Sequence, residues 1–205
     1  MDLNLKNNSK RIVIINYNSG NVKSLGNMLE FMGYNYILSD KKEDILSADK
    51  LLFPGQGHFE QAMNNLKKSG LVDTIHQAIE KKIDFLGICL GLQILFEKSE
   101  EAPNINGLGI LKGVVKKFQK GKTPQIAWNK ITTTQNNSYL SDDYFYFVNS
   151  YYVEPKDKNI ISSTCNYEIE FCSSIQKDNL CAVQFHPEKS STAGIQFFNK
   201  WLNLG

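Results

Sequence analysis

Four short apolar runs, each followed by a stretch with helical periodicity, occupy the first half of this 205-residue chain. The apolar runs are residues 11–17, 34–38, 50–53 and 83–88. The helical stretches are residues 21–33, 41–48, 59–82 (with Gly70 as the expected break) and 90–99. Parallel strands need a crossover between them, and a helix is the usual one, so this alternation predicts a parallel sheet covered by helices on both faces.

The second half of the chain has a different pattern. Apolar or alternating runs, separated by Gly, Lys, Asn and Asp, are found at residues 108–118, 125–133, 144–153, 160–166, 169–175 and 180–185. Such runs are typical of antiparallel strands, with a hairpin turn expected at residues 177–179. A last helix is expected over residues 190–202, with Ser190 or Ser191 as its N-cap. We therefore predict an α/β fold: a mostly parallel central sheet flanked by helices, with an additional antiparallel strand region.

Composition and charge narrow the class of protein. The net charge of +2 gives no reason to expect nucleic acid or an anionic membrane as a partner. No apolar stretch approaches the roughly 20 residues that span a bilayer. Residues 1–10 are polar and rich in Asn, unlike a signal peptide, so we expect a frayed tail there and one domain over residues 11–205.

The four cysteines do not form a metal-binding or disulfide pattern. No two are spaced as CxxC, so we expect no metal, no cofactor and a reducing cytoplasm. Cys165, Cys172 and Cys181 lie in strand patterns and are expected to be buried apolar side chains. Cys89 differs, because it lies between an apolar run and a helical pattern in Gly87-Ile88-Cys89-Leu90-Gly91. Small residues two positions to either side permit a sharp strand-to-helix turn, and the helix N-terminus favours the thiolate, so Cys89 is the candidate nucleophile.

A thiol nucleophile needs a base, and the base needs a group that orients it. His186 follows the strand pattern of residues 180–185, and ligand sites form at the carboxyl ends of strands in open α/β sheets. Pro187 biases His186 away from helix, so Glu188 can accept a hydrogen bond from the imidazole. The alternative for His186 is a solvated loop histidine. Of the other histidines, His76 is expected on a helix surface, and His58 is a weaker catalytic candidate beside a glycine-rich loop.

That loop, Pro54-Gly55-Gln56-Gly57, ends the third apolar run. Its glycines allow backbone N–H groups to approach a ligand closely, and the Leu90 N–H is the natural second donor to an oxyanion. A plain strand-to-helix turn is the alternative.

Three sequence blocks together resemble class I glutamine amidotransferases of the Cys-His-Glu type. They are PGQGHF at residues 54–59, GICLGLQILFEKSEE at 87–101 and QFHPEKSSTAG at 184–194. Four shorter motifs resemble, more narrowly, the glutaminase subunits of imidazole glycerol phosphate synthase, an enzyme of histidine biosynthesis. They are SEE at residues 99–101, the Trp128-Asn129 pair, FVNSYY at 147–152 and EKSS at 188–191.

The resemblance implies a mechanism and a set of roles. Cys89 would attack the side-chain amide of glutamine to give a thioester and ammonia, with His186 moving the proton and Glu188 orienting it. Backbone N–H groups of Gly57 and Leu90 would form the oxyanion hole. Glutamine would be held by four residues at matching positions: Gln93, Glu101, Ser150 and Tyr151.

The resemblance also implies a partner. Ammonia would pass through a tunnel into a (β/α)₈-barrel cyclase subunit, forming a heterodimer that makes imidazole glycerol phosphate and the aminoimidazole carboxamide ribotide. Four residues match interface positions: Asn21, Trp128, Tyr146 and Lys189. Ammonia escapes to solvent unless it is delivered, so a glutaminase without a partner would serve little purpose.

Five residues depart from the usual family pattern: Asn16, Gln56, Gln125, Ala127 and Asn149. None belongs to the triad. Gln56 bears on the conformation of the oxyanion loop, whereas Gln125 and Asn149 bear on the partner more than on the chemistry. Three alternatives therefore stay open. One is a glutaminase that supplies ammonia to a sugar-amidinating enzyme in surface-polysaccharide synthesis. The others are an inactive subunit that stabilises a partner, disfavoured by the complete triad, and a cysteine peptidase, disfavoured by EKSS after HPE.

Overall fold

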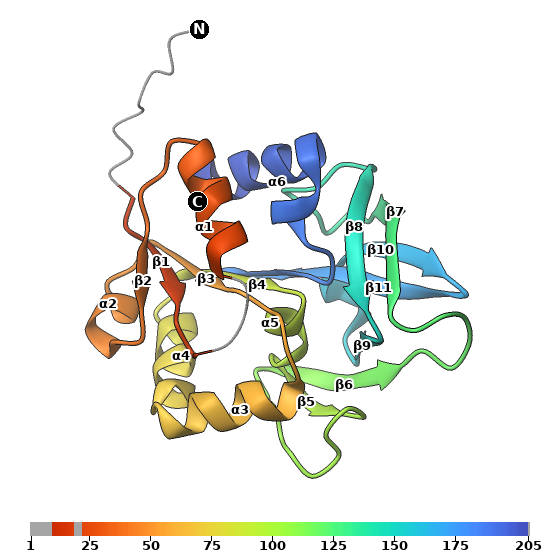
Figure 1. The fold of residues 1–205 in the computed structure, drawn as a ribbon, viewed down its shortest axis with the longest axis horizontal. Coiled ribbons are helices and arrows are strands. Elements are labelled where there is room, and N and C mark those ends of the chain that lie inside the picture. Colours follow the sequence, from red (N-terminus) through yellow and green to blue (C-terminus); the bar gives the residue numbers. More distant parts are fainter. Residues whose placement is uncertain (1–9, 19–21, 205) are drawn as a thin grey trace, which may run out of the picture.

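The computed structural model describes residues 10–18 and 22–204, and its strands form one mixed sheet with helices on both faces (Figure 1). Five neighbouring strands run parallel in the order β2-β1-β3-β4-β12. Their bounds are β1 (Ile12–Ile15), β2 (Ile37–Ser39), β3 (Lys50–Phe53), β4 (Asp84–Ile88) and β12 (Leu180–Val183). The predicted α/β fold with a mostly parallel central sheet is confirmed.

Antiparallel strands extend the sheet beyond β12 in the order β11-β10-β7-β8, and β9, β6 and β5 branch from β11. Their bounds are β5 (Phe96–Ser99), β6 (Leu111–Lys117), β7 (Gln125–Thr133), β8 (Tyr144–Asn149), β9 (Tyr151–Pro155), β10 (Ile161–Tyr167) and β11 (Ile169–Lys177). All of these strands lie between β4 and β12 in the sequence, although β4 and β12 are neighbours in the sheet.

The helices divide between the two faces of the parallel sheet (Figure 1). One face is covered by α1 (Val22–Phe31) and α6 (Ser191–Asn203), and the other by α2 (Lys42–Leu46), α3 (Phe59–Lys68), α4 (Leu71–Glu80) and the short α5 (Leu90–Gln93). Two 3₁₀ turns complete the described elements: η1 (Lys158–Ile160) and η2 (Pro187–Lys189). No helix among the described residues is long and apolar enough to cross a bilayer.

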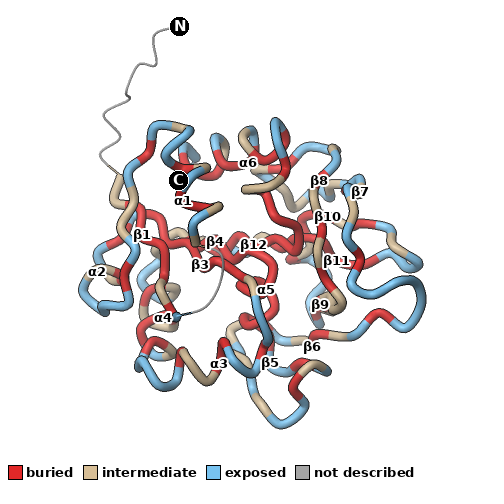
Figure 2. Tube along the Cα trace, in the orientation of Figure 1, coloured by how far each residue is buried: buried red, intermediate tan, exposed pale blue. Residues whose placement is uncertain are grey.

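Two apolar cores explain why β1 is apolar at every position. Along β1, Val13 and Ile15 contribute to the core under α3 and α4, whereas Ile12 and Ile14 contribute to the core under α1 and α6. Successive side chains of a strand point to opposite faces, so a strand covered on both sides must be apolar throughout. Figure 2 shows the central strands as a buried band through the molecule.

Most of the predicted elements are confirmed within a few residues. Gly70 separates α3 from α4 in a left-handed conformation (φ +69°), as expected of the break. The expected tail falls on residues 1–9, which lie outside the described part of the chain, and on Lys10, whose Nζ donates to Leu202 O at 2.9 Å.

The predicted helix over residues 90–99 was wrong beyond its first turn. Helix α5 ends at Gln93, and Phe96–Ser99 forms β5, which pairs parallel with β6. Carbonyls in this segment accept hydrogen bonds from residues 107–111 rather than from the next helical turn, for example Leu108 N–H to Ile94 O at 2.7 Å. A short apolar run does not distinguish a helix from a buried strand.

Two further boundaries differ from the prediction. The run 144–153 is interrupted at Ser150, because β8 pairs with β7 whereas β9 pairs with β6 and β11. Neither candidate serine makes a side-chain N-cap bond to α6. Instead the Ser190 hydroxyl donates to His186 O at 2.7 Å and accepts the Tyr146 N–H at 3.0 Å, which ties η2 to β8.

A buried lysine joins the amino-terminal edge of the sheet to the end of α6. Lys50 is 1% exposed, and its Nζ donates to Asp84 Oδ2 at 2.6 Å and to the carbonyls of Trp201 and Leu204 at 2.9 Å. Lys50→Met leaves a half-buried carboxylate and two carbonyls without this donor, so we expect the free energy of unfolding to fall by about 3 kcal/mol.

Urea denaturation of Lys50→Met and Lys82→Met measures this effect. Lys82 pairs with Asp178 at 3.4 Å, but both side chains are mainly exposed, so its replacement should cost less than about 1 kcal/mol. Equal midpoints for the two variants would contradict a stabilising role for Lys50.

Candidate active site

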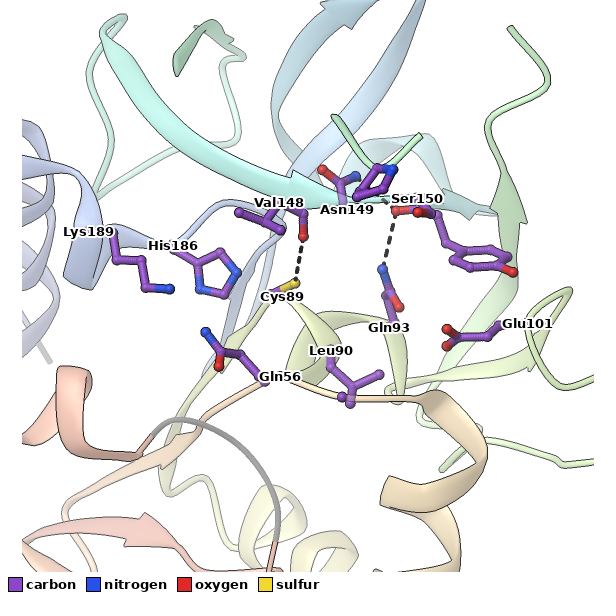
Figure 3. Close-up of a pocket in the computed structure, with 14 residues that line it drawn as sticks. Gln56, Cys89, Leu90, Gln93, Glu101, Val148, Asn149, Ser150, His186 and Lys189 are labelled. Carbon is purple, nitrogen blue, oxygen red and sulfur yellow. Dashed lines mark hydrogen bonds between the residues drawn. The ribbon is translucent and has the colours of Figure 1, made fainter. Parts of the chain in front are cut away.

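A pocket of about 400 Å³ opens at the carboxyl ends of β3, β4 and β12 (Figure 3). The segments that follow these strands line one side of the pocket: Gly55 to Gly57 after β3, Cys89 and Leu90 after β4, and His186 and Lys189 after β12. The strands are parallel and adjacent, so their carboxyl ends meet at one edge, where sites form in open α/β sheets. The other side of the pocket is lined by Gln93, Glu101, Pro124, Val148, Asn149, Ser150 and Tyr151.

Cys89 occupies a strained turn between β4 and α5. Its backbone has φ +53° and ψ −103°, and its N–H donates to Val183 O of the neighbouring β12 at 2.7 Å. A residue that is not glycine is held in this region only when the surrounding structure fixes it, as at a nucleophile elbow. The Sγ atom lies 3.9 Å from Val148 O and 3.5 Å from Gln184 Nε2.

His186 and Glu188 form a buried pair beside the sulfur. The His186 Nδ1 and Glu188 Oε1 atoms are 2.8 Å apart, and the two side chains are 3% and 5% exposed. Pro187 begins η2, and this turn brings Glu188 back toward the imidazole. Figure 3 shows the ring of His186 beside the sulfur of Cys89. The structure therefore brings the three predicted catalytic residues together.

The charge state of His186 follows from these neighbours. Burial by itself would lower the pKa of His186, but the Cys89 sulfur and the Glu188 carboxylate outweigh it and raise the pKa from 6.5 to about 10. These neighbours favour the protonated imidazole, so His186 is suited to take up a proton beside the sulfur.

This pair should make stability depend on pH. The pKa of His186 is higher in the folded chain, so its stabilising contribution is complete below about pH 6.5 and is lost as the pH rises toward 10. We expect the free energy of unfolding to decrease over this interval, and to decrease less in His186→Asn. Urea denaturation of both proteins between pH 6.5 and 10 measures the two slopes, and identical slopes would contradict the pairing.

The predicted oxyanion donors lie at the expected place. Gly57 (φ +115°) and Leu90 both line the pocket next to Cys89. The first N–H groups of a helix have no acceptor within it, so the Leu90 N–H at the start of α5 is available to a ligand. Gly55 packs so tightly on the elbow that a Cβ atom there would overlap with Ile88 O and Leu90 N.

Gly55→Ala should therefore damage the site more than the fold. Relieving the overlap moves either the loop or the elbow. We therefore expect kcat/KM of the reaction at Cys89 to fall at least about 100-fold and the free energy of unfolding to fall by about 1–3 kcal/mol. Gly70→Ala is the matched control, because nothing lies within 4 Å of its would-be Cβ and only backbone strain of about 1 kcal/mol is added. If Gly55→Ala had the same activity as Gly70→Ala, the close packing of Gly55 on the Cys89 turn would not be needed for activity.

The four candidate glutamine-binding residues all line this pocket. Glu101 accepts the Phe59 N–H at the start of α3 at 2.9 Å, and its other oxygen lies 3.2 Å from His58 Nδ1. The Gln93 amide donates to Tyr151 O at 3.2 Å. His58 is 79% exposed and contacts Glu101, and His76 lies on α4, so neither was found beside Cys89.

Known proteins with similar sequences and folds identify the family. The model of the class-I glutamine amidotransferase family matches residues 13–203. The chain belongs to this family. It is 42% identical to imidazole glycerol phosphate synthase subunit HisH 1 of Methanococcus maripaludis, over 94% of this chain and 99% of that protein. These findings confirm the predicted resemblance and class of enzyme.

Two other similarities agree with this assignment. The chain is 41% identical to the chloroplastic imidazole glycerol phosphate synthase hisHF of Arabidopsis thaliana, over 94% of this chain but only 34% of that longer protein. A crystal structure of a glutamine amidotransferase has the same fold, with a TM-score of 0.76, 18% identity and coverage of 94% of this chain and 97% of the other.

The described interface candidates of this amidotransferase lie in two places. Trp128 on β7 and Tyr146 on β8 are cross-strand neighbours with ring centroids 5.9 Å apart. Lys189 lines the pocket from η2. Asn21 lies outside the described residues.

Sequence reasoning missed Gln184. It is fully buried, two residues before His186, and its amide reaches the sulfur. One signal was present, since a glutamine inside the apolar run 180–185 must find buried hydrogen-bond partners.

Proposed function

We propose that this chain is the glutaminase subunit of imidazole glycerol phosphate synthase. It hydrolyses glutamine to glutamate and ammonia and delivers the ammonia to a cyclase subunit in histidine biosynthesis. The observation that carries the proposal is that the elbow thiol of Cys89 and the imidazole of His186 line one pocket, with Glu188 paired to that imidazole. Its support from relatives is the 42% identity to a HisH subunit over nearly the whole of both chains.

In this proposal Cys89 acts as the nucleophile and His186 as the proton carrier. The Cys89 proton passes to His186, and the sulfur attacks the amide carbon of glutamine. Backbone N–H groups of Gly57 and Leu90 donate to the oxyanion. His186 gives its proton to the leaving nitrogen, which departs as ammonia and leaves a thioester. Water, deprotonated by His186, then releases glutamate and restores the thiol, while Glu188 holds the imidazole.

The substrate is proposed to lie across the pocket between the two groups of lining residues. In Figure 3, His186 and Lys189 are on one side of Cys89, and Gln93 and Glu101 are on the other. The Glu101 carboxylate suits the ammonium group of glutamine, and the segment at Ser150 and Tyr151 suits its carboxylate. This places the side-chain amide over the sulfur.

The proposed cyclase docks on the hairpin of β7 and β8. Three large apolar side chains are exposed on this hairpin: Ile126 (61%), Trp128 (48%) and Tyr144 (55%). Exposed apolar surface of this kind is typical of a protein–protein interface. Val148 and Asn149, at the end of β8, line the pocket, so the docking face adjoins the site. We propose that Tyr146, Lys189 and Asn21 also belong to this interface, and that ammonia crosses it through a tunnel into a (β/α)₈ barrel.

The proposal also covers the extent of the domain and the cellular compartment. One amidotransferase domain covers residues 11–205, supported by the family match over residues 13–203. Its compartment is a reducing cytoplasm, supported by four cysteines that are all free and buried.

The test is glutamine-dependent ammonia release, measured with and without a cyclase subunit from the same genome and its ribulosyl aminoimidazole-carboxamide nucleotide substrate. We expect little activity from the isolated chain and at least a tenfold rise with partner and nucleotide, together with imidazole glycerol phosphate as product. The glycine-rich loop motivates this, because it can hold its N–H groups turned away until a partner is bound. Full activity of the isolated chain, or amidination of a sugar nucleotide with a different partner, would overturn the assignment.

A further inference from the structure

A row of buried side-chain amides ends at the sulfur of Cys89. Gln184 Nε2 lies 3.5 Å from Cys89 Sγ, and Gln184 Oε1 lies 3.1 Å from Gln93 Nε2. Gln184 is 0% exposed and Gln93 is 5% exposed. The mechanism described above gives Gln184 no role, although a buried amide beside a reactive sulfur must be matched to the charge there.

The direction of these hydrogen bonds follows from one backbone carbonyl. Tyr151 O can only accept, and it lies 3.2 Å from one end of the Gln93 amide, so that end must be the NH₂ group. The same NH₂ group lies against Gln184, so the end of Gln184 that it meets must be the oxygen. The NH₂ group of Gln184 therefore points at the sulfur. In the flipped amide, the oxygen of Gln184 would face the sulfur and its NH₂ group would face the NH₂ group of Gln93.

Three further amides continue the row and hold it in place. Asn149 Nδ2 also donates to Tyr151 O at 2.9 Å, and Gln125 Nε2 donates to Asn149 Oδ1 at 2.8 Å. Asn129 Nδ2 donates to Gln125 Oε1 at 2.8 Å. Tyr151 O thus receives two donors, which is the number of its lone pairs. No member of the row titrates, so its direction does not change with pH.

We propose that Gln184 is a catalytic residue that donates a hydrogen bond to the thiolate of Cys89, and that Gln93 is the positioning residue that orients it. The proposal rests on Cys89 being the nucleophile of the proposed function. A hydrogen bond to an ionised acceptor is stronger than one to a neutral acceptor, so the Gln184 amide favours the thiolate over the thiol.

A backbone carbonyl near the sulfur favours the thiol over the thiolate. Val148 O, 3.9 Å from Sγ, can accept from an S–H but repels a thiolate. When the proton moves to His186, the contact to Val148 O is lost and the contact to Gln184 is strengthened. Together with the imidazole of His186, these two neighbours set the balance between resting thiol and reactive thiolate.

The test measures the reactivity of Cys89 without glutamine or a partner. The rate of alkylation by iodoacetamide is followed from pH 5 to 10, with the modified peptide identified by mass spectrometry. The variants are Gln184→Met, which keeps the length of the side chain but has no donor, and Gln184→Glu, which places an acceptor at the sulfur. Gln61→Met, an exposed position on α3, is the matched control.

For Gln184→Met we expect the pH of half-maximal alkylation to rise by about one unit, and the rate at pH 6.5 to fall about tenfold. Gln184→Glu should shift further in the same direction, and Gln61→Met should match the unmodified chain. A purely structural role would lower thermal stability without this ordered shift, so superimposable profiles for the folded variants would overturn the proposal.

Gln93→Met keeps the inference testable if the Gln184 variants do not fold. It leaves Gln184 in place but removes the donor that orients it, so a smaller shift in the same direction is expected, and no shift would count against the inference. Alkylation needs neither substrate nor partner. A chain that shows the shift but releases no ammonia from glutamine even with the cyclase and its nucleotide would therefore contradict the proposed function while leaving the hydrogen bond from Gln184 to Cys89 intact.

Discussion

The Cys89→Ala variant is expected to lose all measurable glutamine hydrolysis while its complex with the cyclase still makes product from added ammonia. Removing the sulfur removes the nucleophile, and general base and oxyanion donors cannot replace it. The alanine keeps the backbone of the elbow, and the Leu90 N–H and the β7–β8 hairpin are unchanged, so assembly with the partner should persist. Both activities are measured on the same complex, with glutamine or with an ammonium salt.

Cys165→Ala is the matched control for this experiment. Cys165 is also buried and free, but burial raises the pKa of its thiol to about 12, which keeps it protonated and unreactive. Its replacement should leave glutamine hydrolysis unchanged. Loss of both glutamine-dependent and ammonia-dependent synthesis in Cys89→Ala would show that the two activities do not have separate sites.

The second large effect is expected from His186. In His186→Asn the thiol loses its base and the leaving nitrogen its proton donor, so kcat/KM should fall by about 10³–10⁴. Glu188→Gln keeps an oxygen that can accept from Nδ1 at the same position but loses the charge, so a fall of about 10–100-fold is expected. Steady-state kinetics of the partner complex measures both.

Glu170→Gln, an exposed position on β11, controls for the loss of a carboxylate elsewhere. It should retain full activity. If His186→Asn and Glu188→Gln lose activity equally, Glu188 must do more than orient the imidazole, for example by sharing the proton.

The sequence was sufficient for the sheet of parallel strands and for the meeting of the three candidate catalytic residues at one edge of it. Cys89, His186 and Glu188 could be predicted because each lies just after an apolar strand, and parallel strands bring their carboxyl ends to one edge. The contact of His186 with Glu188 was also predicted, although the 3₁₀ turn η2, and not an extended chain, brings the carboxylate to the imidazole.

The features that were predicted wrongly or missed depend on partners far away in the sequence. Residues 96–99 form a strand because β6 pairs with them, and nothing in their own apolar pattern distinguishes that strand from a helix. Ser190 does not cap α6, because its hydroxyl is used by His186 O and by Tyr146 of β8. The role of Gln184 depends on Gln93 and Tyr151, which reach it only after the antiparallel strands have packed.

The long excursion between β4 and β12 has a consequence for the protein while it is being synthesised. The thiol emerges from the ribosome about a hundred residues before its imidazole, and the two meet only when the whole excursion has folded back. Every truncated or half-made chain that stops short of residue 186 therefore carries a cysteine without a base. In the proposed mechanism such chains cannot hydrolyse glutamine, so no activity is expected before η2, just ahead of the last helix, has been translated.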